Sequence, residues 1–149
     1  MTLEQQLTPA LKEAMRAKDS LKLEALRAIK SALLLAKTEE GGGAALSATD
    51  EIKLLQKLVK QRKDSAAIYR EQNRTDLAEP EEAQAEVITA FLPQQLSDEE
   101  IQAKVKAVIA ELGASSMKDM GKVMGKANAA MAGQADGSRI AAAVKSLLS

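Results

Sequence analysis

Apolar residues recur at three- and four-residue steps along most of the chain, which predicts a succession of amphipathic helices. The first predicted helix follows Thr2, and Gln5 has the spacing of a capping-box partner. Pro9 falls inside this segment. Either the helix bends at Pro9, or it begins at Thr8 with Pro9 at its first position.

Polar and glycine-rich segments separate the next predicted helices. The second helix is expected over about residues 21–40, and the three glycines at 41–43 end it in a loop. Ser47 and Asp50 form another capping pair. We therefore expect a third helix over about residues 50–73.

Prolines mark the later boundaries. Residues 73–78 are predicted to form a break, and Pro80 suits the first turn of a fourth helix. Pro93 cannot continue that helix, and Ser97 with Glu100 has the capping-box spacing that opens a new one. The predicted fold is all-α with two domains: an N-terminal bundle of about four helices over residues 1–92 and a small three-helix domain over 97–149, joined by a linker at about 93–96.

The stretch from residue 113 to residue 137 is less generic than the rest of the chain. Ser116 and Asp119 are spaced as a capping box, which predicts a helix starting at Met117. Gly133 suits a left-handed stop for this helix, and residues 136–138 can cap the last one. Two short helices joined by a tight turn are expected.

The predicted helix after Ser116 presents two unusual faces. Gly121 and Gly125 lie four residues apart, and each costs a helix about 1 kcal/mol relative to alanine. Such a pair is typical of a place where another backbone or a ligand comes close. Another face carries lysine at every fourth position: Lys118, Lys122 and Lys126. The alternative is that the glycines serve helix packing and the lysines only keep the surface hydrated.

Two further patterns each admit two interpretations. Four methionines follow helical spacing and could form an adaptable partner surface or part of the core: Met117, Met120, Met124 and Met131. The outer face of the third helix is basic and could attract phosphates or simply be a solvated flank. Its residues include Lys57, Lys60, Arg62 and Lys63.

The amino-acid composition limits the kinds of partner and reaction that the chain can support. The 149 residues include 21 basic and 21 acidic side chains, so net charge does not indicate a nucleic acid or an anionic membrane as a partner. Any such binding must come from local patches, and no DNA or membrane partner is expected. There is no cysteine and no histidine, which excludes disulfides, thiolate nucleophiles, Ser-His-Asp relays and the commonest zinc ligands. We therefore nominate no catalytic residue, metal or cofactor. No targeting pattern or membrane-length apolar run is seen, so a cytoplasmic protein is expected.

Several segments, in the same order, resemble the YqeY-like family. They are Gln-Arg-Lys-Asp-Ser at 61–65, Asn-Arg-Thr-Asp-Leu-Ala at 73–78, Phe-Leu-Pro-Gln-Gln-Leu-Ser at 91–97, Gly-Ala-Ser-Ser at 113–116 with Asp-Met-Gly-Lys-Val-Met-Gly at 119–125, and Ala-Asp-Gly at 135–137. Each piece alone is weak, but the combination is specific and covers nearly the whole chain.

The resemblance has functional implications. The family is similar to the helical and tail regions of the GatB subunit of the glutamine-dependent aminoacyl-tRNA amidotransferase, in which the tail contributes to holding tRNA and the active site lies in another domain. It implies an accessory protein that binds tRNA or the tRNA-dependent amidation machinery. A protein partner on the methionine surface would be an aminoacyl-tRNA synthetase or an amidotransferase subunit. Carbon–nitrogen ligase activity with glutamine as amido donor is implied by the resemblance alone.

The expected RNA contacts combine this resemblance with the surface patterns. Helix amino termini near Ser116 and Gly137 could receive phosphates, and structured RNA is commonly held by shape and backbone contacts. The expected contact residues are Lys118, Gly121, Lys122, Gly125, Lys126, Asp136 and Gly137, with Lys57, Lys60, Arg62 and Lys63 as a second surface. A helical protein-interaction module without RNA binding remains an alternative.

Overall fold

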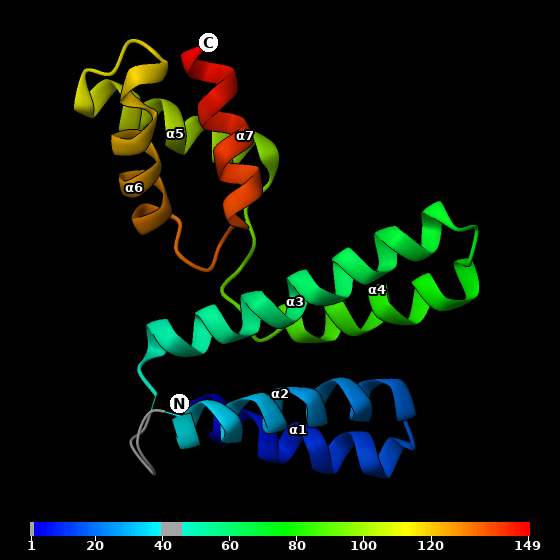
Figure 1. Cartoon of the computed structure of the whole chain (residues 1–149). Coiled ribbons are helices and arrows are strands. Elements are labelled where there is room, and N and C mark those ends of the chain that lie inside the picture. Colours follow the sequence, from blue (N-terminus) through cyan, green and yellow to red (C-terminus); the bar gives the residue numbers. More distant parts are fainter. Residues whose placement is uncertain (1, 40–45) are drawn as a thin grey trace. The chain divides into compact units, whose positions relative to one another are not determined.

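A computed structural model describes residues 2–39 and 46–149 (Figure 1). The described residues form helices and no strand, which confirms the all-α prediction. The helices are α1 Leu3–Ala17, α2 Ser20–Glu39, α3 Ala48–Glu71, α4 Thr75–Thr89, α5 Asp98–Leu112, the short 3₁₀ helix η1 Met117–Asp119, α6 Met120–Ala130 and α7 Gly137–Leu148. The predicted glycine loop at 41–43 lies outside the described residues.

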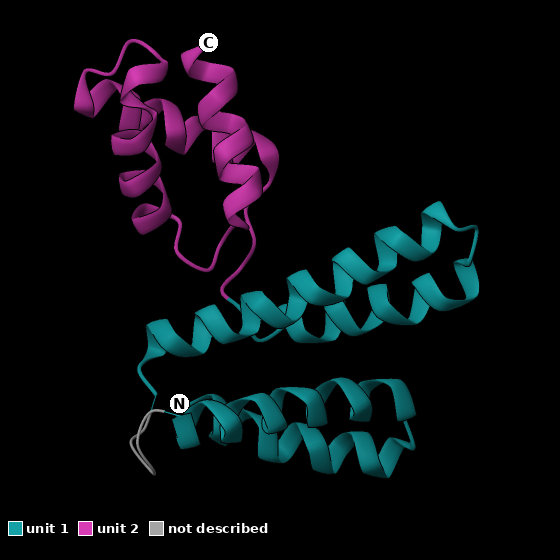
Figure 2. Ribbon diagram, in the orientation of Figure 1, with its two compact units in different colours: residues 1–92 teal, residues 93–149 magenta. Residues whose placement is uncertain are grey.

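The chain divides into two compact units, residues 1–92 and residues 93–149 (Figure 2). The first unit holds α1 to α4, and the second holds α5, η1, α6 and α7. Each unit has its own hydrophobic core. The two cores are therefore described separately.

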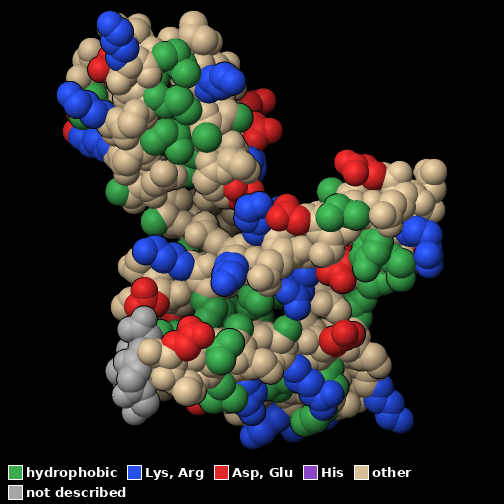
Figure 3. All heavy atoms as spheres, in the orientation of Figure 1, with side chains coloured by type: hydrophobic (Ala, Val, Ile, Leu, Met, Phe, Trp, Pro, Cys, Tyr) green, Lys and Arg blue, Asp and Glu red, His purple; other side chains and the backbone are tan. Residues whose placement is uncertain are grey.

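The first unit consists of two helical hairpins in two layers. α1 pairs with α2, α3 pairs with α4, and the hairpins meet chiefly through α2 and α4 (Figure 1). Hydrophobic side chains are visible between the two layers in Figure 3. The fully buried ones include Leu7, Leu26, Ile29 and Ile88, which come from three of the four helices. Burial of these large side chains is the main stabilising contribution in this unit.

The ends of α1 show how local sequence starts a helix here. The Thr2 hydroxyl accepts from the Gln5 amide, and the Gln5 side chain accepts from the Thr2 amide, so the predicted capping box is confirmed. Pro9 lies inside α1, so the helix begins before Pro9 and not at Thr8. The Leu3 amide donates to Glu51 Oε2 at 3.0 Å, which ties the start of α1 to α3.

The turn between α3 and α4 is shorter than predicted. The expected break at 73–78 is wrong, because α4 already begins at Thr75 and Pro80 lies in its interior. Asn73 adopts a left-handed conformation with φ of 58°, which asparagine tolerates better than most residues. One such residue lets the chain reverse direction within three positions, so no longer loop is needed.

The second unit begins before its first helix. Ser97 and Glu100 form the predicted capping box of α5. The Gln95 side chain donates to the Gly133 carbonyl at 2.7 Å, and the Leu96 amide donates to the Gln134 carbonyl at 2.8 Å. Leu96 is also buried in the core of this unit. Residues that pattern alone suggested as a linker are thus held by the second unit.

Candidate functional site

The segment that opens α6 differs from the predicted capping box. The Asp119 carboxylate accepts from the Ser115 amide at 3.0 Å instead of the Ser116 amide. The Ser116 hydroxyl accepts from the Lys118 amide at 3.4 Å. The chain therefore makes one 3₁₀ turn, η1, and α6 starts at Met120 rather than Met117.

Gly121 and Gly125 lie on an exposed face of α6. A Cβ atom added at either glycine would meet no described atom of the chain within 4 Å outside its own helix backbone and neighbours. Among the described residues, no second backbone packs on this face, so internal helix packing does not account for the pair. The glycines instead leave a strip of bare helix backbone open to the outside.

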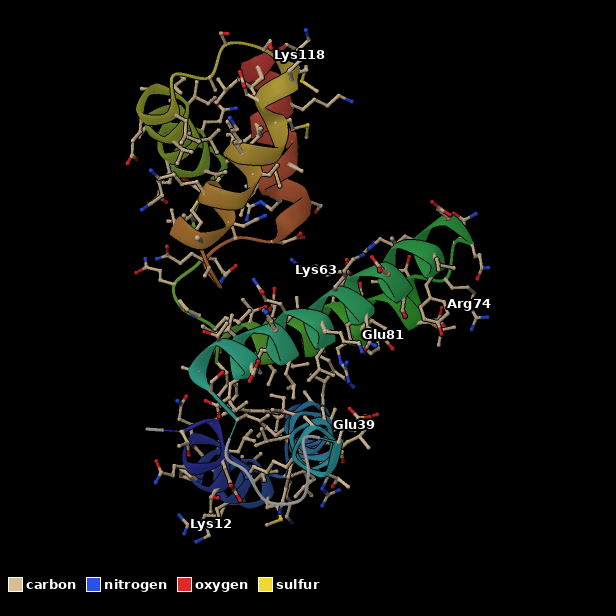
Figure 4. The ribbon with its side chains drawn as sticks, turned by 60° about the vertical axis from the view of Figure 1, so that its left-hand side comes forward. Lys12, Glu39, Lys63, Arg74, Glu81 and Lys118 are labelled. Carbon is tan, nitrogen blue, oxygen red and sulfur yellow. The ribbon has the colours of Figure 1, made fainter. Side chains whose placement is uncertain are left out.

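The three lysines predicted to share a face have different surroundings. Lys126 forms an ion pair with Glu111, with Nζ 2.5 Å from Oε1. Lys118 and Lys122 are exposed, and neither has an ion-pair partner within 4 Å in the described parts of the chain. Lys118 belongs to η1 and points away from the core of its unit (Figure 4). Of the three, Lys118 and Lys122 are therefore more available to an anionic ligand than Lys126.

The methionine stripe mostly serves the core. Met131 is fully buried, and Met120 and Met124 pack partly buried against the same hydrophobic cluster. Met117 is 42% exposed because it lies in η1, ahead of the α-helical register. The stripe is thus largely a packing feature, with one exposed member.

The amino terminus of α7 is capped by its own sequence. The Asp136 carboxylate accepts from the Ser138 amide at 2.7 Å and from the Ser138 hydroxyl at 2.8 Å. A carboxylate already complements the positive end of the helix dipole there. A phosphate would meet that negative charge, so Asp136 and Gly137 are weaker candidates for anion contact than the α6 face.

The second predicted surface separates into two faces of α3. Arg62 turns toward α4, where its Nε donates to Gln84 Oε1 at 3.1 Å and its Nη1 donates to the Leu58 carbonyl. Lys57 and Lys63 are exposed, and Lys60 pairs with Asp64 at 3.0 Å. Arg62 thus joins the two helices of the hairpin, while the lysines form the solvent-facing ridge.

A groove between α3 and α4 was not predicted. It has a volume of about 590 Å³ and is lined by residues of both helices, including Lys63, Arg70, Glu82 and Glu86. Arg70 Nη2 lies 2.5 Å from Glu82 Oε1 and links its two walls. The α3 and α4 residues meet only through the antiparallel register of the hairpin, so periodicity within each helix could not reveal the groove.

Carboxylates with shifted pKa have ordinary structural partners. Hydrogen bonds from Lys37, Arg74 and Arg70 lower the pKa of Glu4, Asp76 and Glu82, respectively. The backbone amide of Ser97 lowers the pKa of Glu100. These groups stay ionised at neutral pH and so are poor proton donors.

In the described parts of the chain, no three or more acidic, cysteine or histidine residues gather as a possible metal site. Within the same residues, no helix has both the length and the apolar character needed to cross a membrane.

Comparison with known proteins identifies the family. A family model described as "Yqey-like protein" matches residues 4–148. The chain is 37% identical over 107 residues to "Altered inheritance of mitochondria protein 41, mitochondrial" of Clavispora lusitaniae, covering 70% of this chain and 61% of that protein. The protein of the same name from Lachancea thermotolerans is 38% identical over 108 residues, covering 71% and 57%.

These matches leave the cytoplasmic location a prediction, because the names of both relatives place them in mitochondria. The matched region spans about three-fifths of the length of these relatives. The family match, in contrast, extends over nearly every residue of this chain, from 4 to 148. The chain therefore belongs to the Yqey-like protein family.

Proposed function

We propose that this protein is a non-catalytic accessory that binds structured RNA, with tRNA as the expected ligand, through the open face of α6. Lys118 and Lys122 supply positive charge, and the bare backbone at Gly121 and Gly125 lets a phosphate-sugar chain approach closely. The choice of tRNA rests on the resemblance to the amidotransferase tail.

The open glycine pair carries this proposal. A glycine in a helix interior costs stability, and neither glycine is needed for packing among the described residues. A ligand that approaches closer than a side chain would allow gives the pair a function. The paired Lys126 lies beside this surface and contributes less, because Glu111 already neutralises it.

Two other functions have less support. A protein-interaction surface built on the methionines would have only Met117 strongly exposed, because the other three pack into or against the core. Carbon–nitrogen ligase activity has no nominated catalytic residue in this chain. Glutamine hydrolysis or ATP turnover by the purified protein would contradict the non-catalytic proposal.

The test compares binding of the full-length protein to bulk tRNA and to a simple hairpin RNA across a salt series. We expect Lys118→Ala with Lys122→Ala to weaken tRNA binding and to lower the slope of log affinity against log salt by about two, roughly one for each phosphate that is no longer neutralised. Circular dichroism should show unchanged helicity.

The matched control is Lys104→Ala with Lys106→Ala, which removes the same charge from exposed positions on α5 of the same unit. Equal weakening by both double variants would show a nonspecific charge effect and contradict the proposed site. No binding by the wild type at low salt would contradict RNA binding itself and favour the protein-interaction alternative.

A further inference from the structure

The α3–α4 groove has an apolar floor and charged walls. Three alanines line it between the charged side chains: Ala66 and Ala85 are almost fully buried, and Ala67 is exposed. The described residues that line it come from α3 and α4 alone. Figure 4 shows Lys63, on its rim, on the side of α3 away from α1 and α2. The groove therefore lies on the outer face of this hairpin.

The two walls of the groove have opposite charge. Lys63 and Arg70 rise from α3, whereas Glu82 and Glu86 rise from α4. This contrast continues along the helices: α4 has five acidic and no basic side chains, whereas α3 has six basic and four acidic ones. The hairpin is therefore basic along one edge of the groove and acidic along the other.

One charge on each wall has no ion-pair partner. Arg70 and Glu82 form an ion pair with each other across the groove. Neither Lys63 nor Glu86 has an ion pair within 4 Å in the described portion of the chain. Lys63 lies seven residues before Arg70, about 10 Å along the α3 axis, and Glu86 lies four residues after Glu82, about 6 Å along the antiparallel α4 axis. Lys63 and Glu86 thus lie toward the same end of the groove.

We propose that the outer face of the α3–α4 hairpin, which carries this groove, packs against the same face of a second copy and forms a symmetric dimer. A twofold axis parallel to the helices places α3 of each copy over α4 of the other. Because this rotation does not move residues along the helix axis, each residue keeps its level in both copies. Lys63 of each copy then faces Glu86 of the other, and Arg70 faces Glu82. A twofold axis across the helices would instead place like-charged walls together.

The small residue between the charged walls suits this arrangement. Ala67 is exposed there, and so short a side chain lets the helices of the two copies come close together. An isologous interface requires one surface to be complementary to itself, and this groove carries both signs of charge on opposite walls at similar height. The proposal concerns assembly and is independent of RNA binding by α6.

Charge exchange tests this pairing in the full-length protein. Sedimentation equilibrium of the wild type should show a monomer–dimer equilibrium. Lys63→Glu and Glu86→Lys should each weaken self-association at least tenfold, because each creates two like-charge contacts per dimer. An equimolar mixture of the two variants should restore dimers. In the mixed dimer, the glutamate introduced at position 63 of one copy meets the lysine introduced at position 86 of the other, while the remaining Lys63–Glu86 pair stays intact.

The same charge changes outside the groove serve as controls. Lys12→Glu and Glu13→Lys make the same charge changes at exposed positions of α1 and should leave the dimerisation constant unchanged. A wild type that remains monomeric at every concentration would overturn the proposal. A dimer unaffected by either groove variant, or one that the mixture fails to restore, would also overturn it, and unchanged helicity would show that both variants fold.

Discussion

At the scale of single residues, the second unit contains glycines with opposite structural roles. Gly113 ends α5 with φ of 65°, a conformation that other residues adopt only with strain. Gly121 and Gly125 have open space where a Cβ would lie and sit on a helix that would accept alanine. Residue type alone does not separate these roles.

This contrast gives a prediction for stability and binding together. Gly125→Ala should stabilise the protein by about 0.5 to 1 kcal/mol, because alanine favours a helix interior, and should nevertheless weaken RNA binding. Gly113→Ala should destabilise it by about 1 kcal/mol or more through left-handed strain. Urea unfolding and the tRNA binding assay measure the two effects. A Gly125→Ala variant that binds tRNA normally would remove the close-approach argument.

Glu100 provides a prediction for pH. The Ser97 amide holds the pKa of Glu100 below its usual value of 4.5, so the ionised carboxylate stabilises the folded cap at neutral pH. Because the pKa is lower in the folded state than in the unfolded state, this contribution is lost as pH falls from about 5 toward 3. Protection of α5 amides from hydrogen exchange should therefore decline over this window.

The comparison variant is Glu100→Gln, which can keep the capping hydrogen bond but does not titrate. Its protection should decline less with acid than that of the wild type. Equal acid sensitivity of the two proteins would assign the effect to other carboxylates.

At the scale of elements, the methionines at the two ends of α6 share one sequence pattern but lie in different environments. The methionine spacing predicts one stripe, but the η1 turn shifts Met117 out of the register of the others. Met131 at the other end is fully buried. Local hydrogen bonds at Ser115 and Ser116 produce this difference.

Truncation of the two end methionines should therefore have unequal effects. Met131→Ala should destabilise the protein by about 2 to 5 kcal/mol, because it leaves a cavity in the core of the second unit. Met117→Ala should change stability by less than about 0.5 kcal/mol, since its side chain is largely exposed. Thermal unfolding of the two variants compares them directly. Similar losses would show that Met117 packs in solution.

At the scale of the whole molecule, the second unit begins earlier in the structure, at Pro93, than the sequence pattern predicts. The capping box at Ser97 suggests a domain that begins there. The contacts of Gln95 and Leu96 with the turn at Gly133 and Gln134 add residues before the helix to this unit. Arg139 Nη2 also donates to the Leu96 carbonyl at 3.1 Å.

Two fragments test this boundary. Residues 93–149 should be more stable than residues 97–149 by about 2 kcal/mol or more, because the longer fragment keeps the buried Leu96 side chain and its hydrogen bonds. Urea unfolding followed by circular dichroism measures the difference. The longer fragment with Leu96→Ala should lose most of that advantage, and equal stability of the two unaltered fragments would contradict the assigned boundary.

Local chemistry in the sequence determined the helical character of the chain and several helix starts. The capping residues Thr2, Ser47 and Ser97 act within a single turn, so their spacing was sufficient to predict them. The break after α3 was misplaced because one left-handed residue, Asn73, was enough to reverse the chain. Interactions confined to a few neighbouring residues mostly follow the pattern, but the capping box predicted at Ser116 and Asp119 also differs, because Asp119 accepts from the Ser115 amide.

Only the tertiary structure decided what the candidate surfaces contain. The lysine spacing could not show that Glu111 neutralises Lys126, or that Arg62 turns to α4 while Lys57 stays exposed. The α3–α4 groove likewise depends on the register of two antiparallel helices. Each of these features joins residues from different helices, and their contacts arise from packing, which the periodicity of one helix does not encode.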